Sequence, residues 1–178
     1  MTRAARWEWA FASEAIARGD LLLLLDDEAA AAQPVDAGDH LWLLPSWRNE
    51  RPEAVKRSWW AEITRANRAL PVDGTVPVRC LCEVVATHSL DEPARRRIAP
   101  FHPWSQERAS KAQRALLVRA KARVSPVSID RPAGDHAYVE LELAQPQGGM
   151  LPALTAEAFA LHRVPLEREL EAADAPRG

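Results

Sequence analysis

The sequence predicts an α+β domain built on a small mixed β-barrel or curled sheet, with flanking helices and a C-terminal helix. Short apolar or alternating segments outnumber the helical ones, as expected for a chain organised around a sheet. These segments are too few and too unevenly spaced for a parallel sheet of repeated strand–helix–strand units. With 178 residues and 47% hydrophobic residues, the chain is long enough to bury a core without disulfides.

The first predicted helix lies just before Gly19. Trp9 and Ile16 share one face at helical spacing, and glycine readily takes the left-handed conformation that ends many helices. Residues 21–25 are all leucine and are followed by three acidic residues. Such a short apolar run with a polar end predicts a buried strand.

The remaining elements follow from the same patterns of hydrophobic spacing and from proline or glycine at their ends. They are a loop over residues 29–39, a strand over 40–44, a helix over 52–70, strands over 76–87, 116–124 and 138–143, a linker over 145–149, and a helix over 155–173 that Pro165 should break or kink. We expect residues 1–145 to form one core domain, with the linker and terminal helix of residues 146–178 packed on it.

Two cysteines lie on the strand predicted over residues 76–87. Cys80 and Cys82 share one face with Val78 and Val84, because side chains two apart on a strand point the same way. Zinc would need two further ligands at suitable spacing, and the sequence offers none. The pattern therefore favours packing in the core, and we expect no metal site and no cofactor.

The charge is concentrated in the middle of the chain. Residues 94–124 contain nine basic residues and one acidic residue, whereas residues 1–40 and 125–178 each have a net charge of -5. The strand at 116–124 alternates apolar residues with Leu117 and three cations, which predicts one buried and one solvated face. The formal net charge of -2 thus conceals a basic centre between acidic ends.

This basic centre favours binding to nucleic acid. Clustered Lys and Arg gain affinity for phosphates through counterion release, and a neighbouring aromatic ring can stack on a base. Pairing of the same cations with the acidic ends of the chain is the equally weighted alternative. The candidate contact residues are Arg95, Arg96, Arg97, Trp104, Arg119, Lys121 and Arg123.

No catalytic set emerges from the sequence. It has neither a Gly-x-Ser-x-Gly motif nor a glycine-rich phosphate loop. The segment from His102 to Trp104 is interpreted either as a pocket wall or, with more weight, as a corner whose Trp plugs the core. Glu140 and Glu142 share one strand face, where a solvated edge is favoured over a metal-binding pair. A hydrolase that uses His102 and Glu140 for acid–base chemistry stays as an alternative.

Several short segments occur in a characteristic order along almost the whole chain. They are residues 7–9 (Trp-Glu-Trp), 15–19 (Ala-Ile-Ala-Arg-Gly), 21–25 (five Leu), 41–46 (Leu-Trp-Leu-Leu-Pro-Ser), 102–104 (His-Pro-Trp), 118–121 (Val-Arg-Ala-Lys), 137–141 (Ala-Tyr-Val-Glu-Leu) and 152–159, from Pro152 to Phe159. Their order resembles that in the uncharacterised bacterial family called domain of unknown function 1802. Asp26-Asp27-Glu28 departs from the family's usual Arg-Lys-Gly-Gly, and residues 47–50 depart from its Tyr-x-His-Gln.

The resemblance implies a bacterial protein with a role near DNA restriction or defence, because members of the family sometimes occur with restriction-endonuclease domains. The helix that ends in Gly19 and runs into a strand is also similar to the opening of ASCH and PUA-like RNA-binding barrels. We therefore expect a non-catalytic nucleic-acid-binding module, with a protein-interaction scaffold as a further alternative. No signal peptide is visible in residues 1–10 and no membrane span is visible, so we expect a cytoplasmic protein. The oligomeric state is left open.

Overall fold

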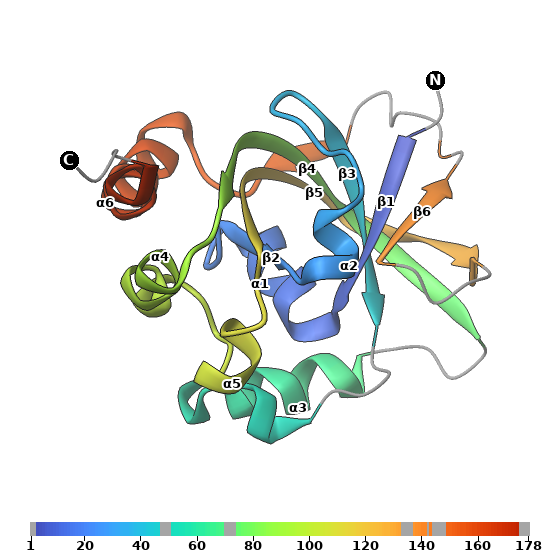
Figure 1. The fold of residues 1–178 in the computed structure, drawn as a ribbon. Helices are drawn as coiled ribbons and strands as arrows, with labels where there is room; N and C mark the ends of the chain where they lie inside the picture. The colour runs from blue at the N-terminus through green and yellow to red at the C-terminus, as the bar shows by residue number, and fades with distance from the viewer. Residues whose placement is uncertain are drawn as a thin grey trace.

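The computed structural model describes residues 3–46, 51–69, 74–132, 137–141, 143 and 149–174. A single curled sheet wraps around one helix, and further helices lie along one side and one end of it (Figure 1). Glu142, residues 47–50 and most of the expected linker at 145–149 lie outside the described residues.

The described chain forms strands and helices in the following order. They are β1 (Arg3–Trp9), α1 (Ala10–Arg18), β2 (Leu23–Asp26), α2 (Glu28–Ala31), β3 (His40–Ser46), two 3₁₀ turns (Pro52–Ala54 and Arg57–Trp59), α3 (Trp60–Arg68), β4 (Thr75–Ser89), α4 (Glu92–Arg97), a 3₁₀ turn (Ala99–Phe101), α5 (Gln106–Ala109), β5 (Arg114–Asp130), β6 (Tyr138–Leu141), β7 (Met150–Pro152) and α6 (Ala156–Asp174).

The sheet is mixed and open, with the strand order β2-β5-β4-β3-β1-β6 and with β7 paired to β5. Among its described ladders, β1 with β3 is the parallel one, and the others are antiparallel. The predicted α+β class with a curled mixed sheet is confirmed. The alternative of a barrel is wrong, because β2 and β6 end the strand order and the sheet is not closed by hydrogen bonds between them.

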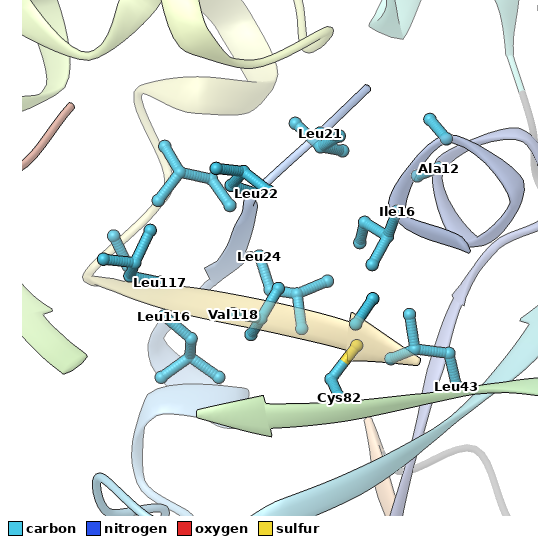
Figure 2. Close-up of a cluster of buried hydrophobic side chains, with 14 of the residues drawn as sticks. Ala12, Ile16, Leu21, Leu22, Leu24, Leu43, Cys82, Leu116, Leu117 and Val118 are labelled. Carbon is cyan, nitrogen blue, oxygen red and sulfur yellow. The ribbon is translucent and has the colours of Figure 1, made fainter. Parts of the chain in front are cut away.

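The main core lies on the concave side of the sheet, around α1. This helix places small residues such as Ala12 and Ala15 against the strands, with exposures of 0%, so its backbone can approach the sheet closely. Figure 2 shows Ile16 pointing toward Leu43 of β3 and Cys82 of β4 within this core. Gly19 ends α1 with a φ of 82° and donates its N–H to the carbonyl of Ile16, which confirms the predicted helix end.

A second, smaller core occupies the opposite face of the sheet. Val78 belongs to it because the pairing of β4 with β5 shifts in register between Val78 and Cys80. An extra residue in a strand reverses the alternation of side chains beyond it. Val78 therefore packs with Trp42 in the second core, whereas Cys80 and Cys82 pack in the first. The expectation that Val78 shares their face is wrong.

Strand β5 is covered on both faces near its start. Leu116 and Leu117 both have an exposure of 0%, although consecutive side chains on a strand point to opposite faces. Leu117 was expected on the solvated face, and this is wrong. Val124, expected to be buried, is 76% exposed, because the far part of β5 extends beyond the main core.

Further elements differ from the expectations. Strands β1 and β7 and helices α4 and α5 were not predicted, and a short α2 replaces part of the expected loop at 29–39. The helix expected over residues 52–70 is two 3₁₀ turns followed by α3, which begins only at Trp60. Helix α6 continues through Pro165. Proline removes the hydrogen bond to the carbonyl of Leu161, four residues earlier, but Leu161 is 76% exposed, so water can satisfy that carbonyl.

None of the helices within the described ranges is both long enough and apolar enough to cross a membrane.

Candidate functional site

The cations of the basic centre separate into two groups that both reach α6. Arg97 of α4 donates to the carbonyl of Glu169 over 3.1 Å, whereas the guanidinium of Arg119 on β5 lies 5.6 Å from the ring centroid of Phe159. Ten residues of α6 separate these contacts, or roughly 15 Å at 1.5 Å per residue. The structure therefore does not combine the predicted cations into one patch.

Two of the three arginines of α4 stabilise the fold. Arg95 donates to the carbonyls of Leu90 and Ala112 over 2.8 and 2.9 Å, and so joins α4 to the segments on either side of it. Arg97 is half-buried against α6. Arg96 is the exposed member, at 76% for its side chain, and it pairs with Glu92 one turn earlier.

The three cations of β5 lie on one face of the sheet. Arg119 and Arg123 are half-buried, and Lys121 is exposed. Strand β7 pairs with β5 here, with Pro152 opposite Lys121 and Met150 opposite Arg123. Because α6 covers part of this face next to Arg119, the row presents Lys121 most fully to solvent.

The segment that carries His102 and Trp104 is held by residues 54–56. The N–H of Lys56 donates to the carbonyl of Pro103 over 2.8 Å, and that of Ser105 donates to the carbonyl of Ala54 over 2.9 Å. The ammonium of Lys56 donates to the carbonyls of Ala99 and His102. Burial lowers the pKa of Lys56 from its ordinary value.

A pocket of about 370 Å³ opens beside this segment, between α4 and α5. We call it the basic pocket, because its charged residues are three cations and one carboxylate. It brings together three of the predicted contact residues, which are Arg95, Arg96 and Trp104. Its other polar lining residues are Lys56, Glu92, His102, Gln106 and Ser110.

His102 is the buried titratable group of the basic pocket, with an exposure of 3%. Burial, followed by the positive charge of Lys56, lowers the pKa of His102 to about 4, against a smaller opposing influence of the backbone of His102 and Trp104. Neither ring nitrogen makes a well-formed hydrogen bond within the described part of the chain. The imidazole is therefore neutral near pH 7 and lies beside three cations.

Trp104 forms a wall of the pocket but does not present its ring to solvent. It is 2% exposed and packs edge-on against Trp9 and Phe11, with centroid distances of 5.2 and 5.3 Å. The guanidinium of Arg108 covers it, with its central carbon 4.0 Å from the Trp104 centroid and 4.4 Å from that of Trp9. The expected stacking of a base on Trp104 does not fit this placement, and the interpretation as a core plug fits it.

Arg108 also separates two further pockets. One, of about 610 Å³, lies on the other side of α5 and is lined by Trp104, Arg51 and Lys111, among others. The second, of about 190 Å³, lies between β1 and β2. We call these the outer pocket and the seam pocket. They share Trp9, Leu25, Asp27 and Arg108 in their walls, so they adjoin each other.

A buried set of charges joins the two ends of the open sheet. Asp26, at the end of β2, has an exposure of 0% and accepts hydrogen bonds from Arg6 of β1, Tyr138 of β6 and Arg114 of β5. Arg6 also donates to the carbonyl of Leu25 over 2.9 Å, which satisfies one carbonyl of β2, the strand at this end of the sheet. We call Arg6, Glu8, Asp26, Arg114 and Tyr138 the seam cluster.

The electrostatics of the seam cluster favour its charged form. Burial alone would lower the pKa of Arg6, but the neighbouring Tyr138, Asp26 and Glu8 and the hydrogen bond to Asp26 raise it above its ordinary value. Burial, with the Asp26 charge in support, raises the pKa of the Tyr138 phenol against the influence of Arg6. The positive charges of Arg6 and Arg114 thus balance the negative charges of Glu8 and Asp26.

Sequence reasoning missed this cluster, although one signal was available. Residues 5–9 alternate as Ala-Arg-Trp-Glu-Trp, which is the period of a strand. The polar members, Arg6 and Glu8, lie on the concave side and are both 4% exposed. A polar inner face is the reverse of the usual pattern.

The structure does not bring together the groups considered for catalysis or metal binding. Glu140 lies exposed on β6, at the opposite end of the sheet from the segment of His102 (Figure 1). The thiols of Cys80 and Cys82 lie 3.9 Å apart in the core, and their hydrogen bond and burial raise the pKa of Cys82 well above its ordinary value. Over the residues that the structure describes, no group of three His, Cys, Asp or Glu side chains is arranged to hold a metal ion.

The fold and its pockets define an α+β domain with an open, curled mixed sheet whose ends are joined by buried charges. The chain belongs to the family described as Domain of unknown function (DUF1802), whose model matches residues 5–163. The resemblance drawn from the ordered segments is thus confirmed. Searches of the curated proteins and of the solved structures found no match to the chain.

Proposed function

We propose that the protein is a non-catalytic nucleic-acid-binding module that contacts phosphates through the basic pocket. The observation that supports this most directly is the gathering of Lys56, Arg95 and Arg96 around one pocket with Glu92 as the opposing charge. Neutral His102 adds one hydrogen-bond donor and one acceptor to the pocket without changing its net charge. Phosphate groups favour such a site, because neutralising them releases counterions.

The proposal extends to the setting of the protein. We place the protein in the cytoplasm, as expected from the sequence, and the family resemblance implies a role near DNA restriction or defence. The end of α1 at Gly19, followed closely by β2, supports a likeness to ASCH and PUA-like RNA-binding domains, although the sheet is open. The row of Arg119, Lys121 and Arg123 on β5 serves as a second phosphate contact in this proposal.

Arg96→Gln tests the proposal without disturbing the fold, because Arg96 is exposed, whereas Arg95 and Arg97 bind backbone carbonyls. Fluorescence anisotropy with single- and double-stranded DNA and RNA at two or more salt concentrations is the measurement. We expect weaker binding and a salt slope reduced by about one. Arg65→Gln is the matched control, since Arg65 is exposed and pairs with Glu62 on α3.

Lys121→Gln tests the second contact in the same assay. Equal affinities for the wild type, Arg96→Gln and Arg65→Gln would refute the assignment of the basic pocket. An effect of Lys121→Gln alone would move the phosphate contact to β5. Absence of binding at low salt would refute nucleic-acid binding altogether.

A protein-interaction scaffold is the second candidate, and α6 supports it. Leu161 and Val164 lie three residues apart on this helix, so they share a face, and they are 76% and 44% exposed. Light scattering across a range of salt concentrations tests self-association. Self-association lost at high salt would favour contact between the basic centre and an acidic surface, whereas self-association lost on Leu161→Glu would favour this apolar face.

A further inference from the structure

The seam pocket contains polar groups whose hydrogen-bonding capacity the fold does not use. Glu8 is 4% exposed; its Oε1 accepts the N–H of Trp9 over 2.9 Å, and its Oε2 lies 3.3 Å from Nη2 of Arg6. A carboxylate can accept about four hydrogen bonds. Glu8 therefore keeps acceptor capacity in the wall of a pocket.

One donor in the same wall lacks a partner. Within the described ranges, Nε of Arg6 is buried and has no hydrogen-bond partner. Nε1 of Trp7 also lacks a partner, but the Trp7 side chain packs with the second core on the opposite face of the sheet. Buried unpaired donors are costly and infrequent in folded proteins. Asp26 differs from Glu8, because Arg6, Arg114 and Tyr138 all donate to it. The contacts that join the two ends of the sheet thus use the acceptor capacity of Asp26, but they leave acceptor capacity on Glu8 unused.

The seam pocket also offers a flat surface. The guanidinium of Arg108 lies over the ring of Trp9, with its central carbon 4.4 Å from the centroid, and both residues line the pocket. Because the guanidinium covers the Trp9 ring, the planar guanidinium itself is the surface on which a heteroaromatic ring can stack. The walls of the adjoining outer pocket carry Arg51 and Lys111, which can contact a phosphate, and also Asp27, Glu53 and Glu107, which oppose it. The combined site fits a ring in the smaller space and a phosphate in the larger one.

The pattern of acceptors and donors selects among the bases. Guanine presents two adjacent donors, N1–H and the N2 amino group, next to the acceptor O6. A carboxylate beside a guanidinium complements this edge, since the two oxygens accept the donors and the guanidinium donates to O6. Adenine, cytosine and uracil each present a single donor position on that edge. They would therefore leave one oxygen of the carboxylate without a hydrogen bond from the base.

We propose that the seam pocket binds the guanine ring of a guanine nucleotide, with Glu8 accepting hydrogen bonds from N1–H and N2–H. The guanidinium of Arg108 forms the stacking surface, and Arg51 and Lys111 of the adjoining outer pocket contact the phosphate. This proposal does not use the basic pocket and holds whether or not that pocket binds nucleic acid. The nucleotide is either free or a guanosine turned out of a strand.

Calorimetry with the full chain tests the proposal through ligands that differ by single groups. Inosine monophosphate lacks only the N2 amino group, so we expect it to bind at least about tenfold more weakly than guanosine monophosphate. Adenosine monophosphate should bind more weakly still. Oligonucleotides with one guanine, or with inosine or adenine in its place, extend the same comparison to a strand.

Glu8→Gln should remove the preference for guanine over inosine, because the carboxamide turns one acceptor into a donor. Glu140→Gln is the matched control, since Glu140 is an exposed glutamate on β6, and it should bind like the wild type. Thermal unfolding shows whether Glu8→Gln is folded. If it is not, the comparison of guanosine and inosine on the wild type decides.

The outcomes distinguish a free guanine nucleotide from a guanosine in a strand. They also distinguish guanine binding at the seam pocket from phosphate binding at the basic pocket. Selective binding of the mononucleotide indicates a free ligand, and selectivity found only in the oligonucleotides indicates a strand. Equal binding of the guanine, inosine and adenine ligands, or no binding of any of them, would overturn the inference. Arg96→Gln should weaken oligonucleotide binding without changing the ratio of guanine to inosine affinity, so failure at the basic pocket remains distinguishable from failure at the seam.

Discussion

Replacing Asp26 by asparagine tests whether the seam cluster holds the two ends of the sheet together. The Asp26 side chain is 0% exposed, and those of Arg6 and Arg114 are 5% and 14% exposed. Arg114 contacts one carboxylate oxygen through Nε and Nη2 at 2.9 and 2.7 Å. Asparagine removes the negative charge but keeps the size, so Arg114 loses its buried counter-charge and Arg6 keeps only that of Glu8.

The expected cost follows from the burial of these partners. Removing one member of a buried ion pair costs about 3–5 kcal/mol, since the remaining charge is left without compensation. For a domain of this size, that loss corresponds to a fall in Tm of about 6–20 °C. Tyr138→Phe provides a smaller step, because it removes only the hydroxyl that contacts Arg6 and Asp26, at about 1 kcal/mol.

Urea unfolding followed by circular dichroism measures these differences. Asp27→Asn is the matched control, because Asp27 is the adjacent, exposed residue that caps α2 by accepting the N–H of Ala30 over 3.0 Å. Asparagine caps helices as well as aspartate does, so this change should be nearly neutral. A free energy of unfolding for Asp26→Asn within about 1 kcal/mol of the Asp27→Asn value would refute the role given to the seam cluster.

Two further predictions concern stability. His102 has its pKa lowered from 6.5 to about 4, so the unfolded chain binds a proton before the folded one does, and the free energy of unfolding should fall from about pH 6.5 to pH 4 by at most about 3 kcal/mol. His102→Gln should flatten this part of the profile, whereas the exposed His162→Gln should not; parallel profiles would contradict the assignment. Gly19→Ala should cost more than Gly38→Ala: both residues have positive φ, but a Cβ at Gly19 would overlap Leu154, whereas one at Gly38 meets nothing within 4 Å. Equal costs in chemical denaturation would show that the contact with Leu154 does not matter.

Local patterns in the sequence predicted most of the secondary structure. The helix before Gly19, the leucine strand and the strands near residues 40, 80 and 120 all appear in the structure. Each depends on hydrophobic periodicity and on the conformational limits of one or two residues at its end, which are properties of neighbouring positions. The family could likewise be identified from ordered short segments.

Strand β1 escaped prediction because its inner face is polar. Arg6 and Glu8 occupy positions where the pattern of a buried strand calls for apolar side chains, and their partners Asp26 and Tyr138 are distant in sequence. Buried charges are tolerated only when paired. That pairing exists only after the sheet has curled and brought β1, β2 and β6 together.

The amino-acid sequence alone determines the basic character of the middle of the chain, and its hydrophobic pattern predicted the α+β class. The tertiary structure alone decided which cations are available: Arg95 and Arg97 bind backbone carbonyls, whereas Arg96 lies exposed at a pocket. It also buried Trp104 beneath Arg108. The physical reason is that charge and periodicity are properties of local sequence, whereas burial, pairing and pockets depend on which distant segments the fold brings into contact.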